Sequence, residues 1–368
     1  MNHQERASRK GSMKTLDNIE EMKKLDPSNV LGSIDLFPDQ CLTAWTEASK
    51  VEFPQNYKQA ANIVVCGMGG SRFTPKTIRE LFFKEITVPY EIVDSYDLPG
   101  YVNEHSLVIL SSYSGSTEEV ISCGEQALEK KALLTGLAHG GKVIDLLKSN
   151  NLPYYQFDAK ANPCGQPRVG GGYLLMGHLA FLSSLGFLHI SQDEVISAIG
   201  YAQTQAKTLN ANVPTEKNSA KQLAILLKDK HPFLIAGEFL RGAVNGFANQ
   251  INETAKMISD FRYIPELNHH LMEGLMRPDT LHQNGLFVFL NSSLYSEKIQ
   301  KRFVISKDVV EKQHVSTHVI ELMGKTKLAQ VLELFTLSGY TTFYLAMLYD
   351  TDPVAVPWVD YFKAQLAK

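Results

Sequence analysis

Short apolar runs recur through the first half of the chain, and segments with helical spacing separate them. The runs are rich in β-branched residues and leucine. They occupy residues 61–66, 88–93, 106–111, 133–138 and 154–157. The spacing predicts one helix at residues 75–83, a second that ends at residue 130 and a third that begins at residue 142. Apolar strands that alternate with helices are typical of a parallel sheet covered on both faces.

A second series of the same kind follows a helical region at residues 172–228. Its strands are predicted at 233–238, 286–290 and 314–320, and a long helix at 327–348. The strand ends of the two series are similar. Ile-Val-Val-Cys-Gly at 63–67 corresponds to Phe-Leu-Ile-Ala-Gly at 233–237, and Val-Ile-Leu-Ser at 108–111 to Val-Phe-Leu-Asn at 288–291. We interpret the chain as two copies of one α/β unit, of which only the first has glycine-rich turns.

The predicted fold is therefore α/β, with two flavodoxin-like αβα sandwich subdomains on parallel sheets and a short helical N-terminal segment. A length of 368 residues agrees with about two domains. We divide the chain into a leader and helical segment at 1–50, a first domain at 51–205 and a second at 206–368. The helices of the first segment break at Asp26-Pro27.

Composition excludes several classes of protein. Apolar residues make up 44% and charged residues 20%, too apolar for a disordered chain. A net charge of -3 disfavours a nucleic-acid binder. None of the four cysteines forms a Cys-x-x-Cys pair, which excludes zinc ribbons and indicates a reducing cytosol. The start is polar and is no signal peptide, and we leave residues 1–12 out of the fold.

One uncharged segment, residues 169–192, nearly reaches the length of a membrane span. Its five glycines and its histidines favour a buried core helix or a dimer helix instead. We therefore expect no membrane association.

Two loops in the first half have the composition of a phosphate site. Gly67-Met-Gly-Gly-Ser71 and Ser112-Tyr-Ser-Gly-Ser-Thr117 each follow a strand and open a helix. Glycines let the backbone approach a ligand, and helix N-termini attract anions. The candidate phosphate-binding residues are Gly70, Ser71, Ser112, Ser114 and Thr117. No Gly-Lys-Ser/Thr follows, and the absence of lysine favours a monophosphate. The structural alternative is a pair of tight turns with Ser/Thr caps.

These two loops resemble the sugar-isomerase (SIS) domain, and the chain from about residue 50 to 368 resembles the bifunctional phosphoglucose/phosphomannose isomerase family. Four further motifs carry the resemblance. They are Gly165-Gln-Pro-Arg168, Asn249-Gln-Ile-Asn-Glu-Thr-Ala-Lys256, Tyr263-Ile-Pro-Glu-Leu-Asn-His-His270 with Glu273-Gly274, and Val356-Pro-Trp-Val-Asp-Tyr-Phe-Lys363. The resemblance implies two SIS-type subdomains and interconversion of glucose 6-phosphate and fructose 6-phosphate, with mannose 6-phosphate as a second aldose.

The resemblance also implies roles for individual residues. Glu253 would be the base that moves a proton between C1 and C2 through a cis-enediol(ate), and Arg168 would stabilise the charge on that intermediate. His269 would open the sugar ring with help from Lys363. The family uses no cofactor and no metal, and its histidine comes from the neighbouring subunit. A cytoplasmic homodimer with a shared active site is therefore expected.

Several alternatives stay open at this stage. A one-residue slip of the third motif would make His270 the ring-opening group, and Glu266 is a rival base. His269, His270, Glu273 and His282 could instead form a metal site, although their spacing is not that of a zinc helix. The chain could also act on another phosphosugar, or be a non-catalytic phosphosugar-binding regulator, which would need neither Glu253 nor His269.

The fourth motif bears on the choice of sugar. Some family members have a threonine seven positions before the catalytic lysine, where this chain has Val356. Valine has nearly the same volume but lacks one hydrogen bond, a difference worth about 1 kcal/mol. We therefore expect activity on both aldoses, in a ratio that Val356→Thr changes only modestly.

Overall fold

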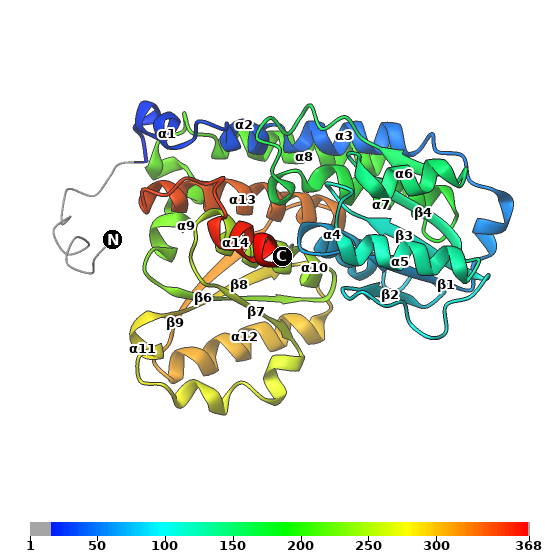
Figure 1. The fold of residues 1–368 in the computed structure, drawn as a ribbon. Helices are drawn as coiled ribbons and strands as arrows, with labels where there is room; N and C mark the ends of the chain where they lie inside the picture. The colour runs from blue at the N-terminus through cyan, green and yellow to red at the C-terminus, as the bar shows by residue number, and fades with distance from the viewer. Residues whose placement is uncertain (1–15, 367–368) are drawn as a thin grey trace.

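The protein contains two parallel β-sheets joined by a layer of helices (Figure 1). The computed structural model describes residues 16–366, so the leader predicted at 1–12 lies outside the described residues. The first sheet has the order β2-β1-β3-β4-β5 and the second the order β7-β6-β8-β9. The strands are β1 (Asn62–Cys66), β2 (Tyr90–Val93), β3 (Ser106–Ser111), β4 (Leu133–Ala138), β5 (Tyr154–Gln156), β6 (His231–Gly237), β7 (Asp260–Ile264), β8 (Gly285–Ser292) and β9 (Ser316–Leu322).

The two sheets share one topology. In each, the first strand of the series lies inside the sheet, the second lies at its edge, and the third and fourth follow on the other side. Every pairing is parallel. This order confirms the predicted α/β fold with two parallel sheets, and it supports the interpretation of two copies of one unit. The five strands of the first sheet precede residue 205, and the four of the second follow it.

The sequence pattern misses β7. This strand pairs only with β6 and carries the polar residues Asp260 and Arg262, and only Ile264 is buried. An edge strand needs few buried side chains, so it lacks the apolar run that marks interior strands.

Helices cover both sheets and fill the space between them. They are α1 (Ile19–Leu25), α2 (Val30–Asp35), α3 (Phe37–Ala48), α4 (Gly70–Leu81), α5 (Glu118–Glu129), α6 (Gly141–Ser149), α7 (Gly171–Ser184), α8 (Gln192–Leu209), α9 (Ser219–Leu227), α10 (Arg241–Thr254), α11 (Leu281–Asn284), α12 (Glu297–Lys312), α13 (Lys327–Leu348) and α14 (Pro357–Leu366). The predicted break at Asp26-Pro27 is confirmed, because the Asp26 carboxylate accepts hydrogen bonds from the first N–H groups of α2, at Val30 and Leu31.

Helix α4 begins at Gly70, earlier than the predicted start at Pro75. Proline has no N–H to donate to the carbonyl four residues before it, which here belongs to Ser71. The hydroxyl of Ser111 donates to that carbonyl instead, at 2.8 Å. The proline therefore frees an acceptor that ties the start of α4 to the end of β3.

Two apolar helices lie in the interior. Nearly all of α7 is buried, and it packs against α3, which confirms the prediction of a core helix for the uncharged segment 169–192. Within residues 16–366, α13 is the one helix with the length and hydropathy of a membrane span, and its apolar window is fully buried in the protein. A helix that protein encloses on all sides is a core helix.

The two halves share their largest apolar core. This core contains side chains from both sheets and from the helices between them. A smaller core lies on the other face of the first sheet, beneath α5 and α6. Helix α10 of the second half packs on α4 of the first, which brings the second motif, at 249–256, toward the phosphate loops.

Candidate active site

The two phosphate loops meet at the point where the strand order of the first sheet reverses. One follows β1 and the other follows β3, and these strands are neighbours that continue in opposite directions across the sheet. Open α/β sheets bind ligands at the carboxyl edge of such a switch point. The backbone N–H of Tyr113 donates to the hydroxyl of Ser71 at 3.0 Å, so the loops are in direct contact.

The helices that leave these loops begin without a side-chain cap. The N-cap residues are Gly69 for α4 and Thr117 for α5, and neither supplies a capping hydrogen bond. The Thr117 hydroxyl is instead 2.9 Å from the hydroxyl of Ser112. Uncapped N–H groups at two adjacent helix starts can both point at one small anion.

The loop hydroxyls differ in exposure. Ser71 and Ser112 are buried, whereas Ser114 is exposed and Thr117 is partly exposed. Ser112 accepts a hydrogen bond from the N–H of Gly115 at 3.0 Å, so it shapes the loop from inside. The structure thus brings all five predicted phosphate residues together, with Gly70, Ser114 and Thr117 nearest to solvent.

Two glycines give these loops their shape. Gly69 has a φ of +50°, and Gly115 has a φ of +71°. A Cβ atom at Gly115 would lie 1.7 Å from the carbonyl oxygen of Gly140, so no other residue fits there.

A buried histidine supports the loops from below. His178 on α7 lies 2.9 Å from the Ser111 hydroxyl, which itself donates to the carbonyl of Ser71. Because that hydroxyl hydrogen is already used, Nε2 of His178 must be the donor. Burial lowers the pKa of His178 to about 3.

This histidine should make the protein sensitive to acid. Its pKa is about 3 in the folded chain and 6.5 in the unfolded one, so between these values only the unfolded chain binds the proton. The free energy of unfolding should therefore fall by about 1.4 kcal/mol per pH unit as the pH drops below 6.5. In urea unfolding between about pH 6 and pH 4, the free energy of unfolding of His178→Gln should therefore depend less steeply on pH than that of the wild type. His105→Gln, at an exposed position, is the control; equal slopes in wild type and His178→Gln would contradict the assignment.

In the second half, the corresponding loop holds a carboxylate of the chain. The loop after β6 presents Glu238, whose carboxylate accepts from the N–H of Ser296 at 3.2 Å and from its hydroxyl at 2.5 Å. Ser296 precedes α12, the helix that corresponds to α5. The Glu238 carboxylate thus occupies the start of α12, whereas the start of α5, the corresponding helix of the first half, has no side-chain cap.

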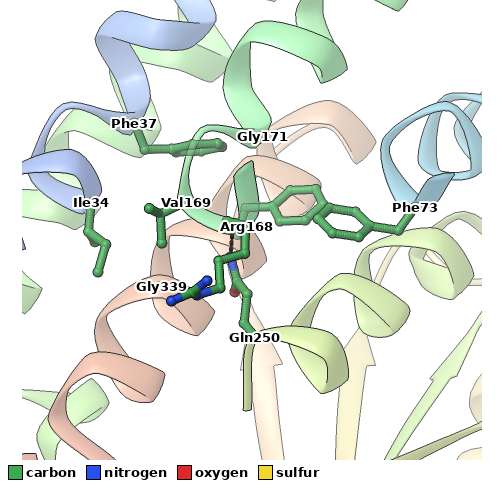
Figure 2. Close-up of a pocket in the computed structure, with 9 residues that line it drawn as sticks. Ile34, Phe37, Phe73, Arg168, Val169, Gly171, Gln250 and Gly339 are labelled. Atoms are coloured by element: carbon green, nitrogen blue, oxygen red, sulfur yellow. Dashed lines mark hydrogen bonds between the residues drawn. The ribbon is translucent and has the colours of Figure 1, made fainter. Parts of the chain in front are cut away.

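Arg168 lies beside the phosphate loops, on the short 3-10 helix Pro167–Val169. The carbonyl oxygen of Pro167 is 3.6 Å from the position that a Cβ atom would take at Gly70. The Arg168 side chain is 3% exposed, and the amide of Gln250 on α10 donates to its main-chain carbonyl at 2.8 Å (Figure 2). Its guanidinium therefore has a fixed place between the two halves.

Arg168 also lines a cavity of about 20 Å³, together with the other residues drawn in Figure 2. Such a volume holds about one water molecule, too little for a sugar. A substrate would have to bind outside this cavity.

Glu253 faces Arg168 from the last turn of α10. One carboxylate oxygen is 3.7 Å from Nη1 of Arg168, and the side chain is 39% exposed. Burial raises the pKa of Glu253, while the charges of Arg168, Lys256 and Lys363 act in the opposite direction. The structure therefore joins three predicted catalytic residues, namely Glu253, Arg168 and Lys363, at the junction of the halves.

Lys363 reaches this site from α14, the C-terminal helix. Figure 1 shows α14 across the middle of the molecule. All residues of α14 are exposed or partly exposed, and Lys363 is exposed. The helix contributes a charge to the site without burying a side chain in the chain itself.

The structure does not bring His269 to the other catalytic residues. His269 ends the short 3-10 helix Glu266–His269 after β7, and no hydrogen bond or ion pair within residues 16–366 joins it to Glu253, Arg168 or Lys363. Both His269 and His270 are exposed, as is the rival base Glu266. Asn268 fixes this segment, since its amide donates to the Ser306 hydroxyl at 2.7 Å and its carbonyl accepts from Arg302 at 3.1 Å.

The alternative metal site is not assembled in the part of the chain that the structure describes. No group of three or more His, Cys, Asp or Glu side chains converges among these residues.

Sequence reasoning missed the residues that hold the site together. Gln166 accepts a hydrogen bond from Nη1 of Arg168 at 2.9 Å, Gln250 holds the Arg168 backbone, and the Lys256 ammonium donates to the carbonyl of Glu253 at 2.9 Å. Burial lowers the pKa of Lys256 to about 8. All three stand inside the quoted motifs, two to three positions from a catalytic residue. Their closeness in the sequence to a predicted catalytic residue is the signal that could have identified them.

Known proteins resemble the chain along most of its length. A model of the bacterial phospho-glucose isomerase C-terminal SIS domain matches residues 216–366. The chain is 29% identical to a bifunctional phosphoglucose/phosphomannose isomerase of Caldicellulosiruptor bescii, over 91% of this chain and 98% of the relative. It is 28% identical to the enzyme of the same name from Aquifex aeolicus, over 88% and 94%.

The fold resembles that of a hypothetical protein from Thermus thermophilus. The crystal structure of that protein superposes with a TM-score of 0.73 at 18% identity, covering 95% of this chain and 93% of the other. The second sheet lies within the residues that match the SIS domain. The chain as a whole is similar, along most of its length, to bifunctional phosphoglucose/phosphomannose isomerases.

Proposed function

We propose that this protein is an aldose–ketose isomerase that interconverts glucose 6-phosphate and fructose 6-phosphate, and mannose 6-phosphate and fructose 6-phosphate. The observation that carries the proposal is the pairing of Glu253 with Arg168 at 3.7 Å, next to two uncapped helix starts. A phosphate on the helix starts would leave the sugar carbons over the carboxylate and the guanidinium.

The carboxylate is suited to move a proton between C1 and C2. In the proposed mechanism Glu253 removes the proton from one carbon and returns it to the other through a cis-enediol(ate). The raised pKa of Glu253 brings the carboxyl closer to neutrality, where an acid–base group works best. One base can serve both aldoses, because glucose and mannose 6-phosphates give the same enediol. Val356, which is partly exposed, lies next to α14 and leaves space without a hydroxyl.

The guanidinium has two N–H groups without a hydrogen-bond partner among the described residues. Of the five N–H groups of an arginine, two on Nη2 donate to the carbonyl oxygens of Pro353 and Val354, and one on Nη1 donates to Gln166. The two that remain are the buried Nε–H and the second hydrogen of Nη1, the nitrogen nearest to Glu253. The remaining Nη1 hydrogen is the donor that we assign to the enediolate oxygen.

Ring opening requires a group that protonates the ring oxygen. We assign it to His269, which we expect to enter the site from a second copy of the chain, with Lys363 assisting. This arrangement requires a homodimer with shared active sites. We place the enzyme in the cytoplasm, with sugar phosphates as its partners and no role for nucleic acid, membrane, cofactor or metal.

A coupled assay of the purified protein tests the proposal. Glucose, mannose and fructose 6-phosphates are supplied one at a time, with and without a chelator. We expect turnover of all three and no effect of the chelator. Activity on one aldose alone would refute the dual specificity. Loss of activity with the chelator that a divalent ion restores would refute the metal-free mechanism.

Thr117→Val should weaken phosphate binding more than it slows the reaction. The threonine hydroxyl lies at the start of α5, and a phosphate contact acts on ground state and transition state alike. We expect KM to rise several-fold, about 1 kcal/mol for one hydrogen bond, with kcat nearly constant. Thr208→Val, at an exposed position on α8, is the control. A fall in kcat at constant KM would contradict a simple anchoring role.

A further inference from the structure

The side chains of α14 do not explain why this helix lies where it does. No side chain of α14 is buried, and Trp358 is 81% exposed, yet the charge of Lys363 acts on Glu253 and opposes the rise in its pKa that burial causes. A helix without buried side chains gains little from packing. Its position must therefore come from the chain that leads into it, the connection between α13 and α14.

That connection is held by its backbone carbonyls. Lys256 donates to the carbonyl oxygen of Asp352 at 2.8 Å. Arg168 donates to the next two, those of Pro353 at 2.5 Å and Val354 at 2.7 Å. Three consecutive carbonyls thus receive charged donors from two different parts of the chain. Hydrogen bonds with a charged partner are stronger than neutral ones.

Lys256 also fixes itself to the end of α10. Its ammonium donates to the carbonyls of Glu253 and Thr254, at 2.9 and 3.2 Å. The same ammonium therefore bridges the helix end that carries Glu253 and the connection that leads to Lys363. Its backbone has a φ of +54°, a left-handed conformation that lysine adopts only when its surroundings hold it there.

We propose that Lys256 is a positioning residue for the isomerase reaction: its ammonium clasps the 352–354 turn and so keeps α14 and Lys363 beside Glu253. The inference rests on the proposed function, but the clasp itself can be measured without a substrate. Lys256 has no role in touching the sugar. Arg168 shares the clasp, so the residue that faces the intermediate also depends on the same turn.

Trp358 provides a direct reporter of α14. The chain has two tryptophans, so Trp45→Phe leaves Trp358 as the sole indole. In this background we compare Lys256→Met with Lys256→Arg and with Lys131→Met. Lys131 is the matched control because it is exposed, follows the end of α5 and has a similar φ of +56°. The control separates the effect of the clasp from that of methionine at a left-handed position.

Lys256→Met should lower the fluorescence anisotropy of Trp358 and increase its quenching by acrylamide. It should reduce kcat by roughly 10²-fold, the cost of a misplaced reacting group, with KM nearly unchanged because the phosphate loops are intact. Lys256→Arg should restore most of both signals, and Lys131→Met should change neither. If Lys256→Met does not fold, Lys256→Gln takes its place.

The two readouts separate the possible failures. Unchanged Trp358 signals in Lys256→Met would overturn the clasp. Altered signals with an unchanged kcat would overturn its role in positioning. If the parent enzyme shows no isomerase activity, the proposed function fails, while the fluorescence still decides whether Lys256 holds α14.

Discussion

Glu253→Gln should lower kcat by roughly 10²- to 10⁴-fold, the usual contribution of a general base. The amide keeps the volume of the side chain and cannot accept the C1 or C2 proton at neutral pH. Because phosphate binding is separate, KM should stay close to its wild-type value. Steady-state kinetics in both directions measure the effect.

Glu266→Gln is the matched control, since Glu266 is the rival base and is exposed on the segment before His269. This variant should keep nearly full turnover. The reverse outcome, an active Glu253→Gln enzyme and an inactive Glu266→Gln enzyme, would transfer the role of base to Glu266.

A mixture of two inactive variants should recover activity if the active site is shared. In a mixed dimer of Glu253→Gln and His269→Asn chains, one site contains both altered residues and the other contains neither. With random pairing, half of the dimers are mixed and half of their sites are intact, so about a quarter of wild-type activity should return. Co-expression with two purification tags isolates the mixed dimer.

The control for this experiment is Glu253→Gln mixed with Lys363→Met. Both residues lie at the same site within one chain, so their mixed dimer has no intact site and should stay inactive. No recovery with His269→Asn would mean that His269 acts within its own chain or not at all. Recovery with His270→Asn alone would assign ring opening to His270.

The fold was largely predictable because its interior strands are continuous apolar runs. The exceptions have local causes. The edge strand β7 carries Asp260 and Arg262 and so lacks such a run. Helix α4 begins at Gly70 rather than at the predicted Pro75, and the Ser111 hydroxyl satisfies the carbonyl that the proline leaves free.

The candidate site was predictable only at the level of motifs. The pairing of Glu253 with Arg168 follows from packing α10 against the first half, which no local pattern encodes. The turn at 352–354 lies 96 residues beyond Lys256, and it takes part through main-chain carbonyls, which carry no side-chain signature. The lowered pKa of His178 comes from its burial, and its hydrogen-bond partner Ser111 stands 67 residues earlier in the chain.

The apolar core that both sheets share limits how this enzyme can move during turnover. Opening the site by a hinge between the halves would expose the apolar side chains of that core to water, at a free-energy cost far above thermal energy. Motions on the timescale of catalysis must therefore be confined to segments outside the core. One such segment belongs to the proposed site itself, the exposed helix α14, and the other is the segment after β7 that carries His269, which we expect a second copy of the chain to supply. Substrate entry and product release thus depend on small displacements of these exposed segments, while the phosphate loops keep their position.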